Sequence, residues 1–505
     1  MKHLLFYLLL LIPTTGWAQQ AAINKIMAMA REDNRAMQHL DILSNRFGGR
    51  PAGSDACTNA EQWAKRCFES WGYDVKLEKA GDLSVGFNRG GWWGRMTGEE
   101  SMVLHFATPS YSSGTKGPQR GHVLIEPRTQ SEFDGMKHRL KGAWVLINGK
   151  SRGGGIARDE ESRTHRREII AKNNEAEKYN KTLTDPDDNR KSINRKEPAL
   201  FYEEMVAAGA LGFIQAASVP IRATYDRSVV KDRTPFDSLP TTPYILLDEE
   251  QYLRIHKLTK QRRNIELEFD IRNYFKIGPV DYHNVVATIK GSKYPDEYVV
   301  MGCHLDSYDV ATGGVDCGNG VSAMMEAARM LSVSGAKPDR TIIFILFAAE
   351  EFGLLGSKAW VKAHPEKIDK ISLMINRDGG PLPYVGFEVP KSMIKEYDKI
   401  VEPIRQLYPE YGFKISEMIP IPRSRIRGGS DYKSFLQVGV PAVKMTMRDA
   451  KGYNFNYGEI WHTERDTYQK AIPEYQEQAA AALAIIALGT ANLPTMLPRE
   501  EFFRP

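Results

Sequence analysis

The sequence predicts an α/β fold, with a mostly parallel mixed sheet flanked by helices and a small inserted α+β, β-rich domain. Two observations indicate this. From about residue 276, apolar stretches typical of buried strands alternate with helical stretches. Between about residues 106 and 275, short strands with one or two helices replace that pattern. We therefore expect a discontinuous main domain over residues 19–105 and 276–492, with residues 106–275 as the insert.

The first 18 residues predict an export signal. Lys2 precedes an apolar run, and the segment ends in small residues, which is typical of a signal peptide cleaved after Ala18. The run is too short to span a membrane, and no later stretch of about 18 or more apolar residues follows. We therefore expect an exported protein, periplasmic or extracellular, without a membrane span.

The main domain is expected to begin with a helical segment over residues 23–47 and the turn GGRPAGS. A helix from Asp55 to about Trp71 and a strand at YDVKLEKA follow. After the insert, strands are expected at HNVVATIKG, EYVVMGCH, TIIFILFAAEE and KISLMINRDGG, and helices at GVSAMMEAARMLSV and LLGSKAWVKAH. The Ala-rich stretch EYQEQAAAALAIIALGTANL predicts a last helix, before a tail over residues 493–505.

The insert contains the strand-like stretches GHVLIEP and GAWVLING, followed by FYEEMVAAGALGFIQAA and TPYILLDEEQYLRI. Within it, residues 155–198 are dense in charge and have few apolar positions. That composition predicts a solvated excursion, partly helical and partly disordered.

Composition is that of an ordinary soluble globular protein. Of the 505 residues, 42% are hydrophobic and 26% charged, and the formal net charge is +5. Basic residues form no stripe with interleaved aromatic residues, so nucleic acid is not an expected partner. Four cysteines are too few to be the framework of the fold. For Cys303 and Cys317 two interpretations stay open, a disulfide or two small buried apolar side chains.

Ionisable side chains gather where predicted strands or loops end. The stretch GCHLDSYDVATGGVDCGNG at residues 302–320 follows a buried run, and further acids close the next two strands. In open α/β sheets the carboxyl ends of strands are where ligand sites gather, so we expect these segments to converge. The side chains that share this placement are His304, Asp306, Asp316, Glu350, Glu351, Asp378, His462 and Asp466.

Imidazole and carboxylate groups are ligands that zinc accepts. Two imidazoles and three carboxylates suffice for two zinc ions if one carboxylate is shared, and each ion then keeps room for water. A water shared by two metals is acidified toward hydroxide, so the pattern predicts metal-assisted hydrolysis with two zinc ions per chain. The candidate ligands are His304, Asp316, Glu351, Asp378 and His462.

Neighbouring acids are expected to complete the site. Adjacent residues at a strand end point different ways, so Glu351 binds metal while Glu350 faces the water as general base and passes the proton to the leaving amine. Asp306 is expected to accept the imidazole N–H of His304, and Asp466 to do the same for the second histidine.

These motifs resemble the zinc exopeptidase family that includes the bacterial double-zinc aminopeptidases. HLDSYDVATGGVD, the EE pair, the Asp after the next strand and a late His before a D-T pair occur in the family's order. NRFGGRPAGS is similar to the family's early turn. The insert resembles a protease-associated domain, on the stretches AAGALGFI and TPYILLD. The similarity covers most of the chain after the signal segment.

The resemblance implies how the ligands divide and what they do. It implies an exopeptidase acting on short peptides, in which His304 and Asp378 hold one zinc ion, Asp316 bridges, Glu350 is the base, and the remaining two ligands hold the second ion. One position departs from the family, which usually has an acid after the bridging aspartate, joined by a cis peptide bond. Here Cys317 follows instead. A homodimer is expected from the resemblance alone.

Two alternative functions stay open, a peptidase-like interaction module without catalysis and a glutaminyl cyclase. For an exopeptidase, it also stays open whether the enzyme acts at the amino or the carboxyl end of its substrate. An aminopeptidase needs an acid or carbonyl for the substrate ammonium, whereas a carboxypeptidase or dipeptidase needs a cation for the carboxylate. The loop IPRSRIRGGSDY contains both, and one of its arginines is the predicted carboxylate contact, with a solvated basic loop as the alternative. The substrate-binding candidates are Arg423, Arg425, Arg427 and Asp431.

Overall fold

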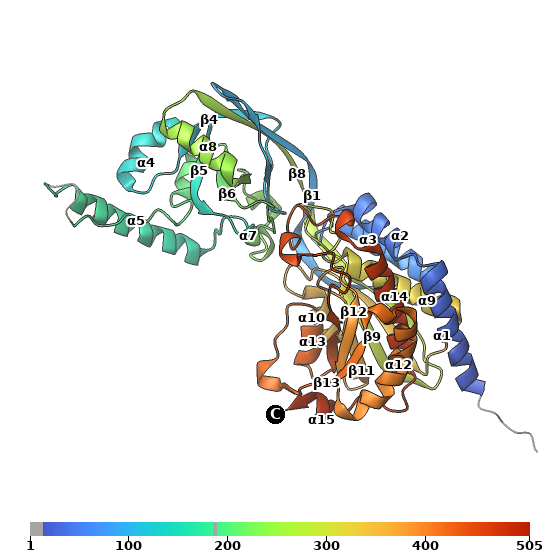
Figure 1. Ribbon diagram of the computed structural model, residues 1–505. Helices are drawn as coiled ribbons and strands as arrows, with labels where there is room; N and C mark the ends of the chain where they lie inside the picture. The colour runs from blue at the N-terminus through green and yellow to red at the C-terminus, as the bar shows by residue number, and fades with distance from the viewer. Residues whose placement is uncertain (1–13, 185–188, 505) are drawn as a thin grey trace, which may run out of the picture.

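The computed structural model describes residues 14–184 and 189–504 (Figure 1). An α/β body occupies the lower part of the view, and two long strands, β1 and β8, connect it to a second body above. The large mixed sheet flanked by helices confirms the predicted fold class. Residues 1–13 of the predicted export signal lie outside the described residues.

The strands that carry the predicted site lie side by side in a sheet of twelve strands. β9 (Tyr294–His304) pairs in parallel with β10 (Arg340–Phe347) on one side and β11 (Ile371–Asn376) on the other, and β15 (Ala442–Lys444) extends the parallel set. Every residue of β10 and β11 is buried, which explains why both read as continuous apolar runs.

β1 (Asp74–Gly98) and β8 (Ile265–Ile289) form a long antiparallel pair. The predicted strand YDVKLEKA is only the beginning of β1, and the predicted strand HNVVATIKG only the end of β8. The register shifts between Arg89 and Trp92, around Gly90 and Gly91, and the strand then continues. β8 also pairs with β10 and with β4 (Gln119–Ile125), so one sheet runs through both bodies.

Helices cover both faces of the lower sheet (Figure 1). One layer consists of α1 (Thr14–Glu32), α2 (Ala36–Asp41), α3 (Asp55–Ser70), α9 (Gly318–Ser334), α12 (Ile394–Leu407) and α14 (Pro473–Ala491), and the other of α10 (Leu355–Ala363), α11 (Pro365–Ile368) and α13 (Tyr432–Gln437). The Ala-rich α14 is buried along most of its length, where small side chains let α9 pack closely.

The insert has its own layered structure. β4, β5 (Ala143–Lys150), β6 (Gly212–Ala217) and β7 (Tyr244–Asp248) run parallel, with β3 (Phe106–Ala107) antiparallel at the edge. Its helices are α4 (Gln130–Met136), α5 (Glu160–Asn180), α6 (Tyr202–Ala207), α7 (Arg227–Val230) and α8 (Glu249–Lys260). The charged excursion contains α5, which buries one face through residues such as Ile169 and Ala176.

The remaining strands are β2 (Met102–Val103), β12 (Tyr384–Val389), β13 (Lys414–Glu417), β14 (Ile421–Pro422), β16 (Thr446–Met447) and β17 (Phe503–Arg504), and the predicted tail contains α15 (Arg499–Phe502). A π-helix spans Ile42–Phe47, and 3₁₀ turns span Lys137–Arg139, Phe236–Ser238, Lys391–Met393, Pro409–Tyr411, Arg423–Arg425, Tyr457–Glu459 and Tyr468–Lys470.

All four cysteines are free thiols, including Cys303 and Cys317. Within residues 14–184 and 189–504, the helices are all too short or too polar to cross a membrane.

Candidate metal centre

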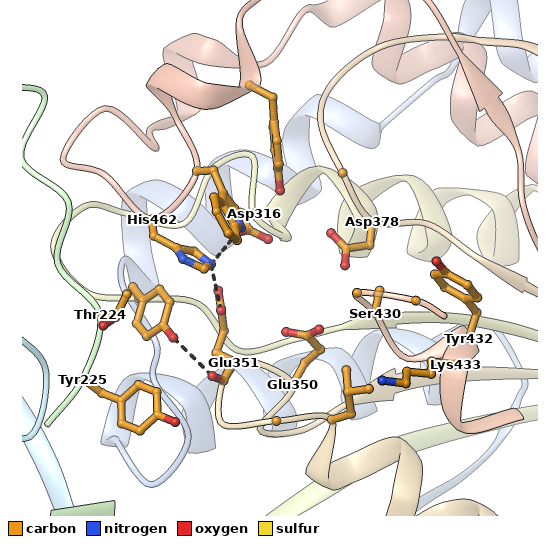
Figure 2. A pocket seen from close by; sticks show the side chains of 18 of the residues that line it. Thr224, Tyr225, Asp316, Glu350, Glu351, Asp378, Ser430, Tyr432, Lys433 and His462 are labelled. Atoms are coloured by element: carbon orange, nitrogen blue, oxygen red, sulfur yellow. Dashed lines mark hydrogen bonds and ion pairs between the residues drawn. The ribbon is translucent and has the colours of Figure 1, made fainter. Parts of the chain in front are cut away.

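The ends of β9, β10 and β11 bring the predicted ligands together. His304 is the last residue of β9, and the Nε2 atom of its ring lies 3.3 Å from Asp316 Oδ1 and 3.9 Å from Asp378 Oδ2. His462 Nε2 lies 3.4 Å from Asp316 Oδ2 and 3.1 Å from Glu351 Oε2 (Figure 2). The Asp316 carboxylate therefore lies between the two imidazoles.

The chemistry of these side chains fits zinc. Three ligand atoms, one from each of His304, Asp316 and Glu351, lie within 4.8 Å of one another. Asp316 Oδ2 and Glu351 Oε1 are buried and accept no hydrogen bond from the described residues. Buried carboxylate oxygens normally accept hydrogen bonds, and a bound cation would take the place of these bonds. The residues present thus suit a site for zinc.

Burial also shifts the ionisation of this cluster. It raises the pKa of Glu351 to about 7 and that of Glu350 to about 11. For His462, burial opposes the charged form, but the carboxylates of Glu351 and Asp316 outweigh it and raise the pKa to about 9. Without a cation, Glu350 and Glu351 therefore keep their protons to higher pH than free glutamates do.

Asp306 meets the His304 ring through its main-chain carbonyl and not through its side chain. The carbonyl oxygen of Asp306 lies 2.9 Å from His304 Nδ1, while its carboxylate is 3.7 Å away. Asp306 Oδ1 instead accepts the backbone N–H of Glu350 at 3.0 Å, and Oδ2 that of Glu351 at 3.2 Å. The strand ends at His304, so the chain turns and presents the carbonyl to the ring. Asp306 thus fixes the turn that carries the two glutamates.

Asp466 also has another partner than the one predicted. Its Oδ1 accepts the backbone N–H of Val315 at 2.6 Å, and its carboxylate faces the N–H of Asp316, so it holds the segment of the shared carboxylate. The partner of His462 Nδ1 is Arg222 Nη2 of the insert, at 3.0 Å. The sequence contains no motif around Arg222 that would have indicated this contact.

A cavity of about 660 Å³ opens over the centre. Figure 2 shows Glu350 between Glu351 and Asp378, with Lys433 nearby. The cations that line the cavity are Arg222, Arg227, Lys358, Lys433 and Lys444. The first two belong to the insert, which also contributes Thr224 and Tyr225.

The predicted arginines lie elsewhere. Arg423, Arg425 and Arg427 are not among the residues that line this cavity, and the Arg423 guanidinium lies over the Phe503 ring, 5.4 Å from its centroid. Asp431 is fully buried, although its neighbours Gly429, Ser430 and Tyr432 line the cavity. The Asp316–Cys317 peptide bond is cis, as in the family that the motifs resemble.

Comparisons with known proteins show similarity to peptidases. Residues 284–487 match the sequence model of peptidase family M28. Carboxypeptidase Q of Mus musculus is 28% identical over 327 residues, which cover 61% of this chain and 65% of the mouse protein. Carboxypeptidase Q of Homo sapiens is 27% identical over 325 residues, or 61% of this chain and 64% of the human protein. The matched part is thus slightly less than two thirds of the length of these relatives.

Solved structures share the fold. A Peptidase M28 precursor from Shewanella amazonensis superposes with a TM-score of 0.59 at 21% identity, covering 96% of this chain and 98% of that one. BSAP, a zinc aminopeptidase from Bacillus subtilis, gives a TM-score of 0.50 at 17% identity, covering 90% and 94%. The predicted resemblance to zinc exopeptidases is confirmed.

Proposed function

On the premise that residues 284–487 belong to peptidase family M28, we propose that the protein is a zinc-dependent exopeptidase that hydrolyses the terminal bond of short peptides. The observation that carries this proposal is the position of Asp316. Its two carboxylate oxygens lie 3.3 Å from His304 Nε2 and 3.4 Å from His462 Nε2. One carboxylate between two imidazoles is the arrangement that two cations with a common ligand require.

The proposal assigns His304 and Asp378 to one zinc ion, Glu351 and His462 to the other, and Asp316 to both. When bound, two zinc ions would polarise the scissile carbonyl and lower the pKa of a water molecule at the site. The remaining chemistry belongs to side chains of the chain itself.

Glu350 is the general base in this proposal. Its carboxylate takes the proton of the attacking water and gives it to the leaving amine, which departs as the peptide bond breaks. The backbone N–H of Glu350 is tied to Asp306 Oδ1 at 3.0 Å, and that of the metal-binding Glu351 to Oδ2 at 3.2 Å. One buried aspartate therefore positions both glutamates, the proposed base and the proposed metal ligand.

The charges around the cavity favour a substrate with a free carboxylate. The acids that line it are Asp316, Glu350, Glu351 and Asp378, all of which this proposal uses as metal ligands or base. Among the described residues that line the cavity, no acid is left for a substrate ammonium, whereas four cations are, since Arg222 already contacts His462. We therefore favour a dipeptidase or carboxypeptidase over an aminopeptidase. In this proposal the cavity cations bind the substrate carboxylate, which the sequence had assigned to an arginine of the Arg423 loop.

Replacing the base tests the activity. Glu350→Gln should lower the rate of dipeptide hydrolysis by about a hundredfold or more while zinc content, measured by mass spectrometry, is unchanged. Glu366→Gln, on the exposed turn at α11, is the matched control and should hydrolyse at the wild-type rate. A Glu350→Gln protein that retains zinc and full activity would falsify the proposal.

Export and assembly complete the proposal. Residues 1–18 support export, and the mature protein should then begin at Gln19 when its N-terminus is sequenced. A homodimer rests on the resemblance alone and is tested by light scattering of the purified protein. The protease-associated character of the insert is likewise proposed from its sequence stretches.

A further inference from the structure

Cys317 lies at the metal centre, directly after the shared carboxylate. It precedes α9 and is fully buried. Its Sγ atom, a ring nitrogen of His304 and a carboxylate oxygen of Asp378 lie within 4.8 Å of one another. Asp316 belongs to the other such group, with His304 and Glu351. The Asp378 side of the centre thus has a sulfur atom close to the ligand atoms of His304 and Asp378.

The backbone packs closely around the sulfur atom. The Cys317 thiol donates to the carbonyl oxygen of Arg377 at 3.2 Å, the residue before Asp378. Gly320, one turn along α9, faces the sulfur, and a methyl group there would collide with it. The backbone on both sides therefore holds the sulfur beside the Asp378 carboxylate.

The donor set suits zinc. Thiolate, imidazole and carboxylate are all zinc ligands, and in a tetrahedral site such atoms stand about 3.5 Å apart. The three atoms here lie within 4.8 Å of one another, so coordination would draw them closer around an ion. Coordination would break the S–H bond and release one proton to solvent, which leaves the Arg377 carbonyl without that donor.

We propose that Cys317 is a sulfur ligand of the cation held by His304 and Asp378. The two metal positions then differ in kind, one with nitrogen, sulfur and oxygen donors and the other with nitrogen and oxygen alone. A soft ligand favours zinc, cadmium and cobalt over magnesium or manganese, so the sulfur position should load first and retain its ion longest during chelation. This inference rests on the proposed metal centre and goes beyond it in the ligand set.

Cobalt spectroscopy tests the sulfur ligand without relying on activity. Metal-free full-length protein is titrated with Co²⁺, and the first equivalent should give a sulfur-to-cobalt charge-transfer band in the near ultraviolet. Cys317→Ser and Cys317→Asp should lose this band while retaining the visible bands of bound cobalt. Cys303→Ala removes the neighbouring buried thiol and should retain both sets of bands.

The outcomes separate the two proposals. Protein that binds no Co²⁺ at all contradicts the metal centre itself. Bound cobalt without the charge-transfer band in the wild type, or a band that persists in Cys317→Ser, overturns only the sulfur ligand. Where the variants do not fold, cadmium NMR of the wild type decides, because a sulfur ligand shifts the resonance of one ¹¹³Cd ion far downfield of the other.

Discussion

Arg50 holds the loop that connects the first two metal ligands. Its buried guanidinium donates from Nε to the carbonyl of Leu305 at 2.6 Å, and from Nη1 and Nη2 to those of Thr312 and Gly313 at 3.3 and 3.1 Å. Arg50→Met removes these charged donors and leaves the carbonyls without them. We expect a loss of about 3 kcal/mol or more in the free energy of unfolding, measured in denaturant, together with weaker zinc binding.

Arg46→Met is the matched control. It lies in the same turn, but its side chain is 71% exposed, with a long ion pair to Asp41. Its effect should stay within about 0.5 kcal/mol. Equal stabilities of the two variants would show that Arg50 does not stabilise the loop.

The side chains that the structure brings together at the candidate centre were predictable residue by residue, but their partners were not. His304, Glu351 and Asp378 stand at or after strand ends, and this placement is visible in the apolar runs before them. The partner of His462 is Arg222, 240 positions away, and no local pattern encodes such a contact. The orienting role of Asp306 depends on where β9 ends and the chain turns, which is a matter of backbone geometry.

At the scale of elements, continuous apolar runs predicted the parallel strands, whereas two glycines in β1 made the full length of the β1–β8 pair hard to predict. β10, β11 and the part of β9 from Val299 on are buried on both faces, so each reads as one run. β1 contains Gly90 and Gly91, which normally indicate a turn, yet here they accompany a register shift within the strand. Pairing along the whole of β8 keeps β1 extended, and that pairing joins segments too distant for a sequence pattern to reveal.

Asn284 on β8 fixes the connection between β10 and α10. Its Oδ1 accepts the N–H of Ala348 at 3.0 Å, and its Nδ2 donates to the carbonyl of Gly356 at 2.9 Å. Glu350 and Glu351 lie between these two points. Asn284→Ala leaves two buried backbone groups unpaired, so we expect a loss of about 2–4 kcal/mol in denaturant unfolding and a lower kcat.

The control for this variant is Asn45→Ala, whose exposed amide contacts only Asp41 in the same helical segment. It should change stability by less than about 0.5 kcal/mol. If Asn284→Ala left kcat unchanged despite the lost stability, the connection would not position the glutamates.

At the scale of the whole molecule, the predicted insert contacts the candidate metal centre. The N–H of Ala223 donates to the carbonyl of His462 at 3.1 Å, and the N–H of Glu464 to that of Ile221 at 3.0 Å. This short backbone pairing holds the loop that carries His462 against the insert. The insert therefore contributes to the cavity wall and supports a ligand as well.

Arg227 on α7 allows the insert's role in substrate binding to be measured. If it meets the substrate carboxylate, Arg227→Met should raise KM for a dipeptide about tenfold, because a charged hydrogen bond is lost. The same variant should leave KM for the corresponding dipeptide amide unchanged. Arg254→Met, on the insert helix α8 and paired with Glu100, is the control. Equal effects on acid and amide would argue against carboxylate recognition by Arg227.

Metal removal should make stability depend on pH. In the metal-free protein, burial raises the pKa of Glu351 from 4.5 to about 7. Burial opposes the charge of His462, but the neighbouring Glu351 and Asp316 raise its pKa from 6.5 to about 9. The folded state thus holds both protons more tightly than the unfolded state. The stability they contribute is present at acid pH and is lost as pH rises from about 4.5 to 9.

Zinc should reverse this dependence, because its ligands must be deprotonated to bind and the ion replaces the protons. We expect Tm of chelated protein, measured by scanning calorimetry, to fall between about pH 5 and 9, and the gap to zinc-loaded protein to widen over the same range. Glu351→Gln cannot ionise, so the dependence of the chelated variant should be weaker between about pH 4.5 and 7, while Glu350, whose pKa burial raises to about 11, retains part of it. Parallel Tm curves with and without zinc would mean that the buried carboxylates do not bind the ion, since binding and protonation would then be unlinked.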